Sequence, residues 1–405
     1  MLRRHASYEF IAYFAVITGW VASLPRALEM GDFSLLGLVG AGVVAAAFAA
    51  WLLDLNMSAR LFKVVWPFMV FLTYVTLRIS ADGWSVGAVQ NIGIWSGFFL
   101  LILISASAAS TCPLFLPRLA QILRLGVWPI AGLLLASIIA GEKDAAIPLA
   151  GLVVLAHLVA SSSATRLLSF APVAVLLVLY LFGGARMPVL AGVALLPALQ
   201  LLHTRRGMAF ARVFRTVLLS AGALLLLVVG FIYIDTFRTS FLQGDQAIKV
   251  AGLAINTSGR MYWWGVVWDS YLMAPWLGTG EAVPAAMEGI RGWSHPHNDY
   301  LRLLHQFGVL GFVLWMLFVW RALVAIIRNA KACSVAGCER QAHGIHDTAA
   351  LAMFATLIVM LTDNPIVYSF VMYPLAVVVG AALGAKPVAV GPVASREKGR
   401  GYANG

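Results

Sequence analysis

The recurrence of long apolar runs along the whole chain most constrains how it can fold. A helix needs about 20 mostly apolar residues to cross a bilayer core. The runs between charged residues give twelve candidate spans, near 10–24, 33–53, 61–79, 86–105, 119–139, 145–160, 167–183, 187–203, 214–234, 304–327, 347–362 and 366–385. Only 11% of the residues are charged, against about 25% in soluble domains. We therefore expect an all-α polytopic membrane protein in which residues 1–405 form a single transmembrane domain.

The distribution of charged residues predicts how these spans are oriented. With a cytoplasmic N-terminus, the inner segments hold 19 of the 28 Lys and Arg residues, and the outer segments hold 9. Positive residues accumulate on the cytoplasmic side of membrane proteins. Both termini are therefore expected in the cytoplasm. The net charge of +11 is explained by topology, and we expect no nucleic-acid partner.

One connection is much longer than the others. Residues 235–303 form a loop of about seventy residues, which the orientation places outside the membrane. Long loops in compact folds are usually functional. We therefore look for the chemistry in this loop, which continues into the span at 304–327, and in the helix ends beside it.

The loop contains an arginine at the expected start of a helix. Ser258 is a suitable N-cap, and the aromatic-rich run from Met261 to Trp268 is typical of a helix lying at the membrane interface. Arg260 then falls in the first turn, where unpaired backbone N–H groups favour anions. We expect Arg260 to bind a phosphate-like anion. The alternative is an ordinary solvated arginine.

A histidine precedes the expected start of the next helix. That helix should begin near Tyr300, with Asn298 or Asp299 as its cap. His297 then lies at the outer membrane surface, where a neutral imidazole can accept a proton. Two alternatives remain open, a capping or interfacial histidine and a metal ligand paired with His295.

A second arginine lies in the sequence Gly183-Gly184-Ala185-Arg186-Met187-Pro188. The Gly-Gly and Met-Pro pairs are expected to break the helix on both sides, which places Arg186 on a tight turn between two outer helix ends. A simple hairpin and an arginine reaching to the membrane boundary are the alternatives. Arg186, Arg260 and His297 share the outer side under an orientation based on other residues.

No metal site is predicted. A zinc site takes three or four ligands at a recognisable spacing, and the pair His295 and His297 supplies only two. The outer acidic pairs are interpreted as solvated loop charges; they are Glu142 with Asp144 and Glu29 with Asp32. We expect no metal and no cofactor.

Several motifs in this region occur together. They are Ser258-Gly259-Arg260 with the Trp-rich helix after it, Pro275-Trp276-Leu277-Gly278-Thr279-Gly280, and His297-Asn298-Asp299-Tyr300-Leu301 followed by Gly308 and Gly311. With these motifs, residues 258–312 resemble the shared core of the O-antigen ligase and polymerase superfamily. Arg186 matches the family's arginine in the turn after the seventh span. The resemblance implies a GT-C-like glycosyltransferase architecture.

The resemblance also implies a reaction. Members of the superfamily use an undecaprenyl-pyrophosphate-linked glycan as donor. Arg186 and Arg260 would then bind the pyrophosphate, and His297 would be the base that activates the acceptor hydroxyl. Such a transfer is expected to be inverting and independent of metal. The residues expected to support the site are His295, Asn298, Tyr300, Arg302 and Asp363.

The O-antigen ligase branch fits best. Such a ligase moves O-antigen from undecaprenyl pyrophosphate to the lipid A-core oligosaccharide, at the periplasmic face of the inner membrane of a Gram-negative bacterium, among membrane lipids. The polymerase branch is described with two long outer loops bearing Arg-x10-Gly patterns, whereas this sequence has one long loop without that pattern. The protein O-oligosaccharyltransferase branch usually carries a further large region. A flippase or transporter of lipid-linked glycans is the alternative of another class, expected to place charge at the midplane.

Overall fold

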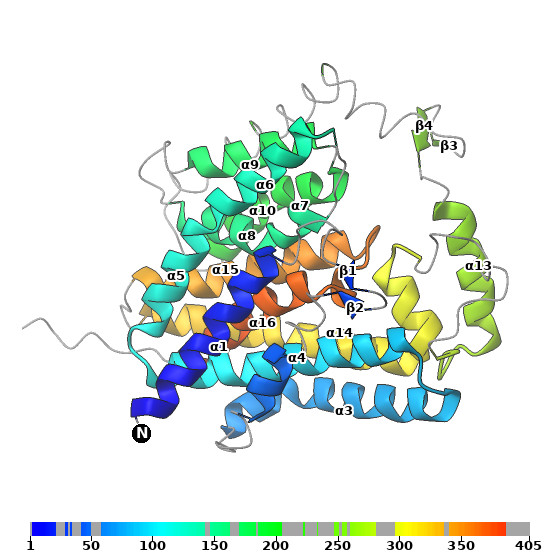
Figure 1. Ribbon diagram of the computed structural model, residues 1–405, viewed down its shortest axis with the longest axis horizontal. Helices are drawn as coiled ribbons and strands as arrows, with labels where there is room; N and C mark the ends of the chain where they lie inside the picture. Colours follow the sequence, from blue (N-terminus) through cyan, green and yellow to red (C-terminus); the bar gives the residue numbers. More distant parts are fainter. Residues whose placement is uncertain are drawn as a thin grey trace, which may run out of the picture.

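The computed structural model describes most of the chain. The described residues are 2–21, 29–30, 33–34, 42–49, 58–141, 146–162, 170–183, 185–204, 222, 233, 247–250, 253–256, 260–280, 296–335 and 340–385. Within them the regular secondary structure is helical apart from two short antiparallel strand pairs (Figure 1). These are β1 (Glu29–Met30) with β2 (Phe33–Ser34), and β3 (Ala247–Val250) with β4 (Leu253–Asn256).

Helices occupy the positions of the predicted spans, except 214–234, of which only residues 222 and 233 are described. For the predicted span 33–53, the described helical part is 42–49, whereas residues 33–34 form strand β2 and not helix. The other helices are α1 (Leu2–Val21), α3 (Ala59–Asp82), α4 (Val86–Thr111), α5 (Phe115–Leu125), α6 (Val127–Ile139), α7 (Ala146–Ala150), α8 (Leu152–Ser161), α9 (Ala171–Phe182), α10 (Arg186–Thr204), α13 (Arg260–Met273), α14 (Asp299–Val335), α15 (Arg340–Val359), η3 (Pro365–Val367) and α16 (Ser369–Gly384).

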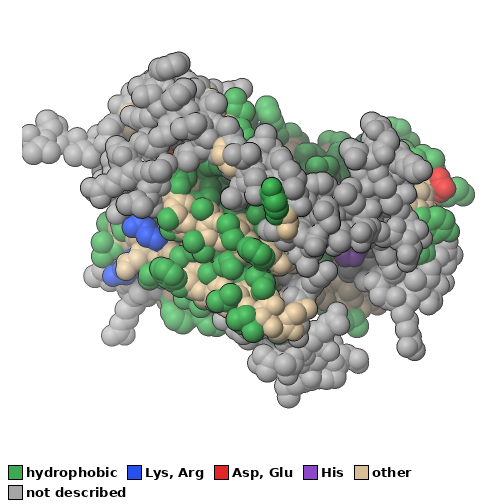
Figure 2. Space-filling model, turned by 90° about the horizontal axis from the view of Figure 1, so that it is seen from above, with side chains coloured by type: hydrophobic (Ala, Val, Ile, Leu, Met, Phe, Trp, Pro, Cys, Tyr) green, Lys and Arg blue, Asp and Glu red, His purple; other side chains and the backbone are tan. Residues whose placement is uncertain are grey.

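Four of the described helical segments are long and apolar enough to cross a membrane. They are Ala59–Asp82, Val86–Thr111, Phe115–Ile139 and Asp299–Ser334, and shorter apolar helices accompany them. In Figure 2 hydrophobic side chains cover much of the described surface in view, with Lys and Arg toward one end and an acidic side chain at the other. The described part has the character of a multi-pass membrane protein. Twelve spans and their orientation stay predictions.

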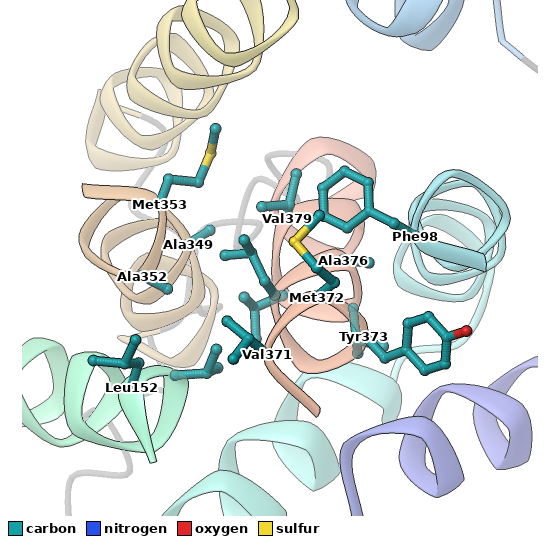
Figure 3. Packing of buried hydrophobic residues seen from close by; sticks show 14 of the residues in the cluster. Phe98, Leu152, Ala349, Ala352, Met353, Val371, Met372, Tyr373, Ala376 and Val379 are labelled. Carbon is teal, nitrogen blue, oxygen red and sulfur yellow. The ribbon is translucent and has the colours of Figure 1, made fainter. Parts of the chain in front are cut away.

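The core is built around α16. This helix packs against α4 on one side and against α15 and α8 on the other, as Figure 3 shows for Met372, Phe98 and Ala349. A side-chain carbon on Gly380 would overlap the carbonyl oxygen of Ile102, and one on Gly384 would overlap that of Ala106. Small residues of this kind let two membrane helices bring their backbones together.

Helix α14 is broken near its N-terminal end, which we call its outer part because the sequence predicts that this end lies outside the membrane. Gly308 has φ 61° and ψ −170°, which an α-helix does not contain. The helix is therefore an outer segment of about two and a half turns, from Asp299 to Phe307, followed by the longer remainder. In Figure 1, α13 stands upright at the outer end of α14, across the direction of α3 and α4.

Candidate active site

Arg260 is the first residue of α13, as the capping pattern predicts; Ser258 lies outside the described residues. Its guanidinium group donates a hydrogen bond to the carbonyl of Thr362. Burial lowers the pKa of Arg260, while Asp363 and Tyr368 partly offset that effect. Arg260 is therefore held in place against the turn after α15, and it is not a freely solvated arginine.

His297 lies just before α14 in an unusual backbone conformation. Its φ is 48°, in the left-handed region that few residues other than glycine adopt. Such conformations cost free energy and cluster at functional sites. The imidazole Nδ1 lies 3.7 Å from Oδ1 of Asp363, and about a third of the side chain is exposed. The backbone thus turns this imidazole toward a carboxylate at the edge of solvent.

The start of α14 is fixed by hydrogen bonds of its first residues. Asn298 caps the helix, because its side-chain oxygen accepts from the backbone N–H of Leu301, 3.0 Å away. The expected cap and helix start near Tyr300 are therefore confirmed. The hydroxyl of Tyr300 donates to the carbonyl of Leu357 in α15 over 2.8 Å, which joins the two helices behind His297.

The turn after α15 packs directly on this helix start. The backbone N–H of Asp299 donates to the carbonyl of Met360, and its carboxylate accepts from the N–H of Ile366 over 3.0 Å. Asp363 in turn accepts the N–H of Asn364 through its Oδ1, at 2.8 Å. Asp363 thus lies near both Arg260 and His297, although it is more than sixty residues away from His297 in sequence.

Polar side chains lie buried behind this surface. Asp299 and Asn364 are fully buried, and Arg302 is 2% exposed. Arg302 donates through Nε to the side-chain oxygen of Gln306 over 2.9 Å. Among the described residues, Oδ1 of Asp299 and the side-chain amide atoms of Asn364 find no hydrogen-bond partner. The site therefore lies over a layer of buried polar side chains. Burying such groups costs free energy unless they find hydrogen-bond partners.

Arg186 is the first residue of α10 and lies close enough to Arg260 for their charges to repel. The expected turn lies between the end of α9 at Phe182 and the start of α10; Arg186, expected on that turn, is the first residue of α10, and Met187 and Pro188 follow in its first turn. Proline is tolerated there since a first-turn N–H has no partner within the helix. Two helices therefore begin with arginines whose charges interact.

The remaining candidates are the possible metal ligands and His305. Among the described residues, no three His, Cys, Asp or Glu side chains lie close enough to hold a metal ion. His295, Glu142 and Asp144 lie outside the described residues. His305 contacts α13 instead, since its Nε2 lies 3.0 Å from Oγ of Ser270.

Sequence reasoning missed Tyr368, which follows η3. Its side chain is partly buried and lies close to Asp363. The same side chain lies near enough to Arg260 to interact electrostatically. The only signal in the sequence was its place shortly after the Asp363-Asn364-Pro365 turn.

Comparison with known proteins adds one finding. Residues 149–316 match the family model described as O-antigen ligase. The matched segment contains Arg186, Arg260 and His297, and it ends before Asp363. No curated protein matches the chain. The match supports the O-antigen ligase and polymerase superfamily and an activity of that type.

Proposed function

We propose that this chain is an O-antigen ligase. It would move O-antigen polysaccharide from undecaprenyl pyrophosphate to the lipid A-core oligosaccharide at the periplasmic face of the inner membrane. The similarity of residues 149–316 to O-antigen ligases supports the class of reaction. In this proposal the chain is one transmembrane domain, and the loop 235–303 carries the active site.

The observation that carries the proposal is the convergence of Arg186 and Arg260. Each begins a helix, where unpaired backbone N–H groups add partial positive charge, and the two guanidinium groups interact. Like charges close together repel, and a bound anion would lower that cost further than the nearby Asp363 does at Arg260. A pyrophosphate supplies such an anion, and arginine matches its oxygens with paired hydrogen bonds.

His297 would act as the general base. It would take the proton from the acceptor hydroxyl as that oxygen attacks the anomeric carbon of the donor sugar. The bond from that carbon to the pyrophosphate oxygen then breaks, and the two arginines stabilise the charge on the leaving undecaprenyl pyrophosphate. Asp363, 3.7 Å from the imidazole, would stabilise the imidazolium that forms. Attack opposite the leaving group inverts the anomeric centre.

The experiment is reconstitution of the purified protein with a polyprenyl-pyrophosphate glycan. Lipid A-core, a second copy of the lipid-linked glycan and an acceptor protein are offered separately, each with and without a chelator. Transfer to lipid A-core with release of polyprenyl pyrophosphate supports the ligase. Transfer only to the second glycan or only to protein identifies the polymerase or protein O-oligosaccharyltransferase reaction instead. Movement of the lipid-linked glycan across the bilayer without transfer identifies a flippase.

A further inference from the structure

The break in α14 is closed by a second segment of chain. The N–H groups of Thr279 and Gly280 donate to the carbonyls of His305 and Gln306 over 2.8 and 2.9 Å. Val309 and Leu310, beyond the break, donate to the carbonyls of Pro275 and Trp276 over 2.8 and 3.3 Å. We call residues 275–280 and 305–310 the clasp. It replaces hydrogen bonds that the helix loses at Gly308.

The clasp leaves no room for side chains at two of its glycines. A side-chain carbon on Gly278 would overlap the backbone of Gln306, and one on Gly308 would overlap the carbonyl of Trp276. Both glycines also have positive φ, 73° and 61°, which favours glycine. The two backbones are therefore in direct contact, and their register is fixed.

Two side chains of α3 hold the clasp from outside. The hydroxyl of Tyr74 donates to the carbonyl of Leu277 over 2.7 Å and lies 3.2 Å from that of Phe307. Arg78 donates to the carbonyl of Gly278 over 3.1 Å, and it also pairs with Asp82 over 2.7 Å. Tyr74 thus reaches both halves of the clasp with one hydroxyl group.

The clasp ties together the two segments that carry the proposed active-site residues. α13 begins at Arg260 and ends at Met273, immediately before the clasp. The outer part of α14 follows His297. The indole N–H of Trp264 also donates to the carbonyl of Pro296 over 2.7 Å. α13 is therefore fastened to α14 near both of its ends, and the placement of Arg260 relative to His297 depends on this frame.

We propose that Tyr74, assisted by Arg78, is a positioning residue that sets the placement of Arg260 relative to His297 through the clasp. This inference rests on the proposed function of those two residues. Displacements of about 1 Å from a reactive geometry can lower rates about a hundredfold. Loosening the clasp should therefore lower kcat, with little effect on KM, although Tyr74 touches neither substrate nor the reacting atoms.

The test compares Tyr74→Phe with Tyr13→Phe. Tyr13 offers a matched control because its hydroxyl also donates to a backbone carbonyl, that of Phe115, over 3.2 Å. We expect Tyr74→Phe to lower kcat for transfer to lipid A-core about tenfold or more, and Tyr13→Phe to leave it unchanged. Equal rates for the two variants would overturn the inference.

The same substitution in a His297→Gln protein distinguishes a positioning role of Tyr74 from a general loss of stability. If Tyr74 acts by placing His297, its removal in a His297→Gln protein should lower the residual rate much less than in the wild type, because coupled residues are not additive. An equal fold-loss in both backgrounds would overturn the positioning role. Arg78→Gln should behave like Tyr74→Phe with a smaller effect.

Amide hydrogen exchange tests the clasp without a measurement of activity. In Tyr74→Phe, the amides of Thr279, Gly280, Val309 and Leu310 should exchange about fivefold faster, and in Tyr13→Phe they should not change. Unchanged exchange in both variants would overturn the clasp inference alone. Absence of transfer by the wild type would instead overturn the proposed function, and the positioning role with it.

Discussion

Arg186 and Arg260 show how two charges can be held where they repel each other. Arg260 is held by the carbonyl of Thr362, and Arg186 is built into the first turn of α10. Because a protein contact fixes the Arg260 side chain beforehand, an anion bound there would not have to order it. Preorganised charge of this kind is a large contributor to catalysis.

Replacing either arginine by alanine should therefore lower transfer strongly. We expect Arg186→Ala and Arg260→Ala each to reduce kcat about a hundredfold or more, with partial recovery by Lys, which cannot form the paired hydrogen bonds. Arg118→Ala is the matched control, since Arg118 is exposed and pairs with Glu9 at 3.0 Å. Rates are measured in the reconstituted assay. Full activity of the double alanine variant would contradict the assignment.

His297→Ala should abolish transfer more completely than His295→Ala or His305→Ala, because a positioned base contributes roughly a hundred- to ten-thousand-fold. His305 is 4% exposed and in contact with Ser270, so its loss should mainly lower the melting temperature. If His297 is the base, the wild-type rate should fall as the imidazole becomes protonated. An active His297→Gln variant with an unchanged pH–rate profile would remove the general-base role.

At the scale of elements, the break in α14 can be tested by a substitution at Gly308. Gly308→Ala forces an alanine into φ 61° and against the carbonyl of Trp276. We expect it to destabilise the protein by about 2 kcal/mol or more. Gly265→Ala in α13 is the control, since nothing lies near its side-chain position and alanine favours helix. Thermal unfolding in detergent measures both; equal melting temperatures would contradict the break.

Local sequence signals predicted the elements that depend on neighbouring residues. The starts of α13 at Arg260 and of α14 at Asp299 follow from capping patterns. Asp363 was expected to support the site, but its contact with His297 could not be predicted, because it depends on two helices meeting across more than sixty residues. The clasp was also missed. The Pro275–Gly280 motif and Gly308 stood out, but a backbone-to-backbone contact has no side-chain pattern.

At the scale of the whole molecule, the apolar runs predicted the positions of the helices well. They predicted less well which side chains the helices bury. Arg302 was expected as a supporting residue, and the structure buries it to 2% exposure together with Asp299. Nothing in the local sequence distinguishes a buried charge from one at the rim. Burial depends on the turn after α15 and on η3, which cover the start of α14.

The orientation of the molecule can be tested at the two ends of α3. Ala59 and Ala81 are both exposed, and the charge distribution places Ala59 inside and Ala81 outside. In a background without cysteine, Ala81→Cys should react with a membrane-impermeant thiol reagent in cells with a permeabilised outer membrane. Ala59→Cys should react only after lysis. The reverse pattern would invert the topology and place the candidate active site in the cytoplasm.

The break at Gly308 divides the macrodipole of α14 in two. Peptide dipoles sum only along an unbroken helix, so the outer segment forms a short dipole of its own. Its positive end lies at Asn298 and Asp299, beside His297, and its negative end lies at the clasp, where Arg78 sits 3.1 Å from the carbonyl of Gly278. The contribution of α14 to the field at the candidate site therefore comes from its short outer segment, independently of the remaining length of the helix.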